Sequence, residues 1–191
     1  MTKDRERECY LFGTNLALLC IYSTDNNEKF YKSLKSLDDN LISRILRQYV
    51  FFRSSFVASM LFSKIKDKKQ CNMVADYFFS KLSDELKINS VALASNEARE
   101  YAETVHNLGE NYPEIIYHIL VKAGIKPGQI SQECFNSFVN FQNDDLQNFW
   151  FGTSGIQNMF KLFNERSRKN SGCLGSLLIL ILVICFLVYV I

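Results

Sequence analysis

The last nineteen residues of the sequence form an uninterrupted apolar segment. Residues 173–191 contain no charged side chain, and from Leu177 onward every residue is apolar or tyrosine. As a helix this segment would be roughly 28 Å long, because each residue adds about 1.5 Å, and the hydrocarbon core of a bilayer is about 30 Å thick. A helix in a protein core keeps a polar face, which this segment lacks. The sequence therefore predicts a C-terminal transmembrane helix that anchors the chain.

The charges that precede the apolar segment indicate its orientation. Residues 165–172 read as a basic and polar linker, in which three cations stand against one acid. Basic residues favour the cytoplasmic side of a membrane. The N-terminus carries charges but no long apolar stretch before a cleavage site, so no secretory signal is predicted. Residues 1–172 are therefore expected to face the cytosol.

The composition of residues 1–172 fits one globular domain and excludes several classes of function. The six cysteines lack the short spacing of a zinc site, so neither a metal nor a cofactor is expected. The net charge is only +2, and no basic stripe is interleaved with aromatic residues, which argues against nucleic acid as a partner. His106 and His118 lie on different predicted helices. Because no HExxH, GxSxG or glycine-rich phosphate loop occurs, no enzyme is expected.

Apolar residues recur at helical spacing, which predicts an all-α fold. The expected helices cover residues 37–64, 71–88, 96–108, 113–123, 129–141 and 144–163. The helix 113–123 is short and strongly apolar, so we expect it at the centre of the fold. Residues 16–22 fit either a helix or a strand. Asp144 and Asp145 are expected to serve the N-terminus of the last helix, where acids are favourable.

The segment FSKLSDEL, residues 79–86, combines an amphipathic pattern with a small residue and an acid. Its apolar positions, with one more residue a turn earlier, follow spacings of four, three and four, which place them on one side of a helix. The segment resembles the BH3 motif of the Bcl-2 family of apoptosis regulators. The matching residues are Ala75, Phe79, Leu82, Ser83, Asp84 and Leu86. An ordinary core-facing helix would show the same apolar pattern, and that interpretation stays open.

Three further segments resemble the same family. GENYPEII, residues 109–116, is similar to the BH1 motif. Its motif positions hold Gly109, Asn111, Tyr112, Glu114, Ile115 and Ile116. WFGTSG, residues 150–155, is similar to the start of the BH2 motif, with Trp150 and Gly155. ILRQYVFFR, residues 45–53, looks like the first helix of Bak-like members. Glu114 departs from the family pattern, which normally has an arginine there that pairs with the Asp of an incoming BH3 helix.

The resemblance implies a Bcl-2-like helical bundle around a central apolar helix, in residues 37–164. Residues 1–36 would be an N-terminal extension, and the anchor would follow the linker. The expected function is regulation of apoptosis at the mitochondrial outer membrane, with a Bak-like pore-forming effector favoured. Expected partners are BH3 helices or grooves of other family members, the membrane and further copies of the chain. The alternatives are a pro-survival guardian, a tail-anchored adaptor unrelated to apoptosis and, for location, the endoplasmic reticulum.

Overall fold

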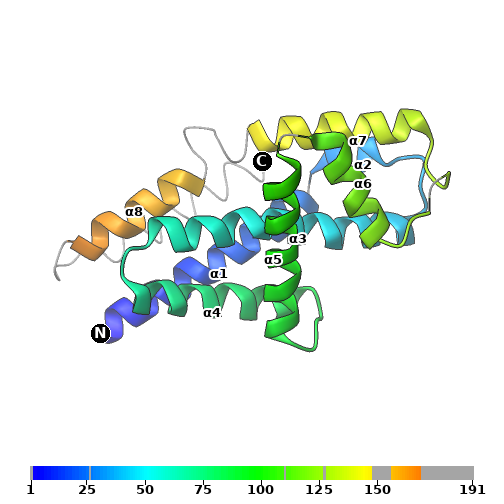
Figure 1. The fold of residues 1–191 in the computed structure, drawn as a ribbon. Helices are drawn as coiled ribbons and strands as arrows, with labels where there is room; N and C mark the ends of the chain where they lie inside the picture. Colours follow the sequence, from blue (N-terminus) through cyan, green and yellow to red (C-terminus); the bar gives the residue numbers. More distant parts are fainter. Residues whose placement is uncertain (1, 26, 110, 127, 148–155, 169–191) are drawn as a thin grey trace.

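The computed structural model describes residues 2–25, 27–109, 111–126, 128–147 and 156–168, and over these residues the chain is helical without any strand. This confirms the all-α prediction. The helices, labelled in Figure 1, are α1 Lys3–Asp25, α2 Glu28–Ser33, α3 Asp39–Lys64, α4 Lys68–Glu85, α5 Val91–Leu108, α6 Tyr112–Lys122, α7 Gln132–Asp145 and α8 Ile156–Arg168. The predicted transmembrane segment lies outside the described residues. No helix within the described ranges is both long and apolar enough to cross a membrane.

Local sequence signals fix the ends of several helices. Asp38, Asp67 and Ser131 each accept a hydrogen bond from the backbone N–H three residues on, at 2.9, 3.0 and 3.2 Å, and so cap α3, α4 and α7. Pro113 stands in the first turn of α6, where its missing N–H costs nothing. Gly124 follows the end of α6 with a φ of 73°, a backbone conformation that favours glycine.

The long helix α3 lies at the centre of the bundle. It packs against α1, α4, α5 and α6, and α5 crosses it steeply (Figure 1). The expectation that residues 113–123 form the central helix is therefore wrong. Helix α6 buries Ile115, Ile116, Ile119 and Leu120 but leaves Tyr117 and Val121 exposed, so it covers one side of α3 rather than occupying the middle.

The N-terminal segment contributes to the same core. Residues 16–22 are helical and belong to α1, which packs along α4 and also touches α3. Leu16, Ala17 and Cys20 of α1 have no exposed surface. Helix α2 packs against α7 and buries Phe30. The segment interpreted as an N-terminal extension thus supplies two helices to the bundle.

Several helix boundaries differ from those expected, and the prediction of one helix over 144–163 was wrong, because its first two residues end α7 and α8 begins at Ile156. Helix α4 begins at Lys68, inside the stretch expected as a loop. Helix α5 begins at Val91, and Ser90 is its N-cap residue. Helix α7 continues to Asp145, so this acid and Asp144 end a helix instead of opening one. The prediction of their role was wrong, because the apolar spacing continues through Phe138 and Phe141 to this turn.

Candidate functional site

The BH3-like segment forms the second half of α4, and its motif residues divide between core and solvent. Leu82 is fully buried, and Ala75, Phe79 and Ser83 are also buried. Asp84 is exposed, and Leu86 is the half-buried residue that follows the helix. The segment therefore has the predicted amphipathic arrangement, with its apolar face turned into this protein's own bundle.

Helix α1 covers α4 at very short range. A Cβ atom placed on Gly13 would come within 2.5 Å of the Val74 carbonyl oxygen and 3.1 Å of the Phe78 nitrogen. Only glycine permits two helices to approach so closely. Nearby, the rings of Tyr10 and Tyr77 meet edge to face with their centroids 5.2 Å apart. The side of α4 that carries Val74 and Phe78 is thus held against α1 by a close-packed contact that depends on a single glycine.

The end of the BH3-like segment is fixed by a small hydrogen-bonded turn. The Ser83 hydroxyl donates to the Ile88 carbonyl oxygen at 2.8 Å, and the Ile88 N–H donates to the Ser83 carbonyl oxygen at 2.9 Å. Lys87 completes this turn with a φ of 53°. The small residue of the motif therefore has a local structural role, since it stops α4 and turns the chain toward α5.

The BH1-like segment spans the turn between α5 and α6. Gly109 follows α5 with a φ of 60°, and Asn111 precedes α6 without capping it through its side chain. Ile115 and Ile116 are buried in the core, Tyr112 is half-buried and Glu114 is exposed in the first turn of α6.

The structure does not bring the BH3-like and BH1-like segments together. Helix α4 packs mainly against α1 and α5, whereas α6 packs against α3, α7 and α5. Figure 1 shows α4 and α6 on opposite sides of α3. Trp150 and Gly155 of the BH2-like segment lie outside the described residues. No shared groove is therefore formed by the two motif segments that the structure describes.

An open pocket of about 340 Å³ does border the BH1-like segment, between the second half of α5 and α6. It is lined by Thr104, Asn107, Leu108, Glu114, Tyr117, His118 and Val121. Tyr117 is 51 % exposed and Val121 47 % exposed at its rim. The lining mixes Leu108, Tyr117 and Val121 with polar side chains and one carboxylate, which suits an apolar side chain carried beside a cation.

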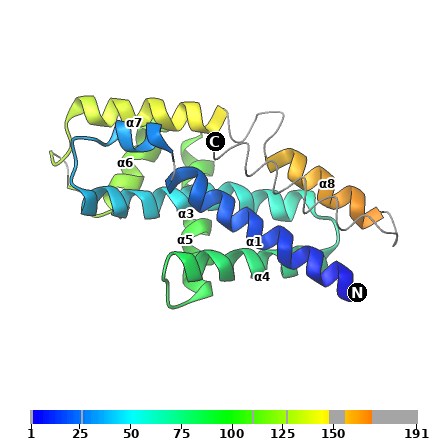
Figure 2. The ribbon, with the colours of Figure 1, turned by 180° about the vertical axis from the view of Figure 1, so that it is seen from behind.

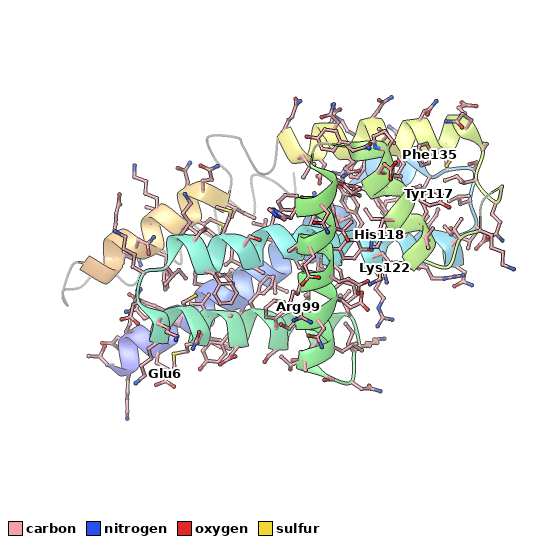
Figure 3. The ribbon with its side chains drawn as sticks, viewed as in Figure 1. Glu6, Arg99, Tyr117, His118, Lys122 and Phe135 are labelled. Carbon is pink, nitrogen blue, oxygen red and sulfur yellow. The ribbon has the colours of Figure 1, made fainter. Side chains whose placement is uncertain are left out.

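A polar cluster lies between α5 and α6 behind this pocket. Figure 3 shows Tyr117, His118 and Lys122 along α6 beside α5. The Lys122 ammonium contacts Glu97 at 2.7 Å and Glu100 at 2.8 Å. Burial lowers the pKa of His118, and the Lys122 charge lowers it further. Within the described part of the chain, the buried Nε2 atom of His118 has no hydrogen-bond partner.

A buried polar cluster, which the sequence patterns did not predict, joins α3 to α7. Arg53 is fully buried in α3, and its Nε donates to Asp145 Oδ2 at 3.0 Å. The Tyr49 hydroxyl donates to the same oxygen at 2.8 Å, and the Arg53 guanidinium also donates to Ser23. Burial raises the pKa of Tyr49 well above its usual range, and the Asp145 charge adds to this.

A signal for this cluster was present in the sequence. Arg53 directly follows the apolar run 49–52 and lies among the buried residues of a long helix. A buried guanidinium requires an acid as partner. The sequence alone did not say which of the many acids it would be. No group of three or more histidine, cysteine or acidic residues within the described ranges could hold a metal ion.

Comparison with known proteins found no family, no curated protein and no solved structure that matches this chain.

Proposed function

We propose that this protein is a tail-anchored regulator of apoptosis of the Bcl-2 type, in which α4 is a BH3-like helix kept inactive by α1. Activation would separate the two helices and allow the apolar face of α4 to enter the groove of a partner. The observation that carries the proposal is the division of α4, with Phe79 and Leu82 covered by the bundle and Asp84 already in solvent.

The position of α4 supports release as the activating step. This helix is joined to the central helix by a three-residue turn and to α5 by a short turn, and its main contact is with α1. Each large apolar side chain that moves from this core into a partner's groove keeps burial worth about 1.5–3 kcal/mol. A partner's groove would therefore recover the apolar burial of α4, but not the burial of the α1 face that the separation uncovers.

The effector role is favoured over the guardian role. A guardian needs a groove that accepts a BH3 helix and a cation that pairs with its aspartate, and this chain has Glu114 at that position. The BH3-like and BH1-like segments lie on opposite sides of α3. This arrangement fits a protein that inserts its own helix into a partner better than a protein whose groove accepts a partner's helix. Overexpression in cells separates the roles, since an effector kills and a guardian protects.

A peptide titration tests the proposal directly. A peptide of residues 69–89 should bind pro-survival guardians saturably, and Asp84→Ala should weaken its binding about tenfold or more, because a charge-assisted contact is lost. Leu82→Glu should abolish binding, because it places a charge in an apolar pocket. The matched control is Asn72→Ala, on the exposed side of α4. If no guardian binds the peptide, α4 is an ordinary structural helix.

The anchor and its address belong to the same proposal. Residues 173–191 would insert in the mitochondrial outer membrane, with the endoplasmic reticulum as the alternative. A fluorescent protein fused to residues 172–191 should label mitochondria, and a reticular pattern would reject that address. An effector should also release dye from liposomes that carry the full chain, once α1 has been loosened from α4.

The second candidate is a tail-anchored adaptor unrelated to apoptosis. It is favoured by the pocket beside Glu114, whose exposed rim of Tyr117 and Val121 is free to contact a partner helix. In this case Val121→Glu should abolish the cellular activity of the full chain while Asp84→Ala leaves it unchanged. The reverse result supports the BH3-like role of α4.

A further inference from the structure

Three segments far apart in the sequence meet at one end of the bundle. The Arg5 Nε of α1 donates to Gln70 Oε1 of α4 at 3.0 Å, and the Arg5 guanidinium lies 4.1 Å from the centre of the Phe163 ring of α8. The Asn164 side-chain amide donates to the Lys64 carbonyl oxygen at 2.9 Å. Figures 1 and 2 both place the N-terminus, the α3–α4 turn and the end of α8 together.

This end of the molecule carries the excess positive charge. Residues 3–8, 64–69 and 161–168, here named the basic end, hold ten cations and five acids, a net charge of +5. The whole chain carries +2, so the remainder carries −3. The net charge of the chain therefore hides a strong separation of charge, which becomes visible only when the fold gathers these three segments.

Four lysines at and beside the α3–α4 turn, here named the turn lysines, form an exposed part of the basic end. Lys64, Lys66, Lys68 and Lys69 are all exposed. Among the residues that the structure describes, none of these four forms an ion pair. Arg5, by contrast, is engaged by Glu8 and Gln70. The ammonium groups of these four lysines are therefore available to an anionic partner in solvent or at a surface.

Helix α8 fixes this end close to the predicted anchor. The Phe163 ring stacks on Phe12 of α1 with centroids 4.3 Å apart, and Phe160 meets Phe12 edge to face. The last residue of α8 is Arg168, and the apolar segment begins five residues later. Five residues span at most about 18 Å in any conformation. A bilayer that holds the apolar segment must therefore lie beside the basic end.

We propose that the basic end is a docking surface for anionic phospholipid headgroups, which orients the bundle on the membrane. The inference rests on the proposed membrane anchor. Lysines close to a negatively charged leaflet are attracted to it over about one Debye length. This orientation places the first turn of α4 at the membrane and turns the α6–α7 side, with the pocket beside Glu114, toward the cytosol.

Lysine acylation on vesicles tests this orientation with the full chain. The protein is reconstituted in vesicles of phosphatidylcholine alone or of phosphatidylcholine with phosphatidylserine, and acylation of each lysine is followed by mass spectrometry. Phosphatidylserine should slow acylation of Lys64, Lys66, Lys68 and Lys69 about fivefold, and high salt should restore the rate. Lys35 and Lys126, at the opposite end of α3, serve as internal controls and should not change. Equal rates in the two kinds of vesicle would overturn the proposal.

A flotation experiment separates failure of the surface from failure of the anchor. Full-length chain that floats with both kinds of vesicle, in low and high salt, is anchored by its tail, and the lysine rates then decide whether the basic end binds lipid. Flotation only with phosphatidylserine vesicles, reversed by salt, would support the basic end and reject the anchor. Replacing the four turn lysines with glutamine should remove the effect of phosphatidylserine. The same replacement of Lys32, Lys35 and Lys126 should leave it intact.

Discussion

Arg53 in the middle of α3 and Asp145 in the last turn of α7 form an ion pair inside the bundle. The two residues are 92 positions apart in the sequence, and their side chains are 1 % and 3 % exposed. Burial by itself would lower the pKa of Arg53, but the Asp145 charge, the Tyr49 hydroxyl group and the hydrogen bond to Asp145 together raise it. The pair therefore links the central helix α3 to α7.

Asp145→Asn should lower the free energy of unfolding by about 3–5 kcal/mol, because it leaves the buried Arg53 charge without its counterion. Urea unfolding followed by circular dichroism measures the change. The neighbouring Asp144→Asn is the matched control, since its 3.7 Å contact with Lys29 is exposed and worth at most about 1 kcal/mol. Equal losses in the two variants would contradict the burial of the pair.

Tyr49→Phe should cost about 1–3 kcal/mol, because Asp145 loses a hydrogen bond in a site that water does not reach. The ring itself stays packed against Phe138 and Phe141, so the loss reports the hydroxyl alone. Tyr117→Phe, at an exposed position, should leave the unfolding midpoint in urea unchanged. A silent Tyr49→Phe would mean that the hydroxyl contributes nothing to the cluster.

Gly13→Ala should destabilise the bundle by about 1–3 kcal/mol, although alanine is the better helix former, because the new methyl group collides with the backbone of α4. Hydrogen exchange should rise first in α1 and α4. Thr14→Ala, one position along the same helix, is the control. If α4 is a latent BH3 helix, Gly13→Ala should also increase binding of the full chain to a guardian. Destabilisation without any gain in binding would reject the proposal that α1 keeps α4 inactive. It would still agree with the close contact between the two helices.

Stability should fall as the pH rises above about 9. Burial raises the pKa of Cys20 from 9.0 to about 12, so the unfolded chain loses this proton before the folded one does. Between those values each such group lowers the free energy of unfolding by about 1.4 kcal/mol per pH unit. Urea titrations across this range should give a flatter slope for Cys20→Ala than for the wild type. Identical slopes would show that the thiol is accessible to water.

Stability should also fall as the pH drops below about 6.5, partly because of His118. Burial holds the pKa of this imidazole below its usual value, so the unfolded chain takes up the proton first. The facing groups are Lys122, Glu97 and Glu100, of which the lysine opposes protonation. The loss of stability between about pH 7 and about pH 5 should be smaller in His118→Gln. His106→Gln, at an exposed position, is the matched control variant.

Helical periodicity and helix-end signals were enough to locate most of the helices. Both depend on residues close in the chain, such as the aspartate that caps α3 and the glycine that follows α6. The same local information predicted that Phe79 and Leu82 share a face of α4. It failed at Asp144 and Asp145, because an acid near a helix end fits the start of one helix as well as the end of another.

The sequence by itself determined the helical class, the amphipathic faces and the apolar C-terminal segment, because these follow from the side chains of neighbouring residues. Only the tertiary structure decided that α3 is central, that Arg53 pairs with Asp145 and that Gly13 lies against Val74. It also decided that the two motif segments stand apart and that three modestly charged segments form one basic end. These relations depend on which helix faces pack together. The helices have apolar faces of similar size, so the sequence pattern of each helix does not specify which other helix it packs against.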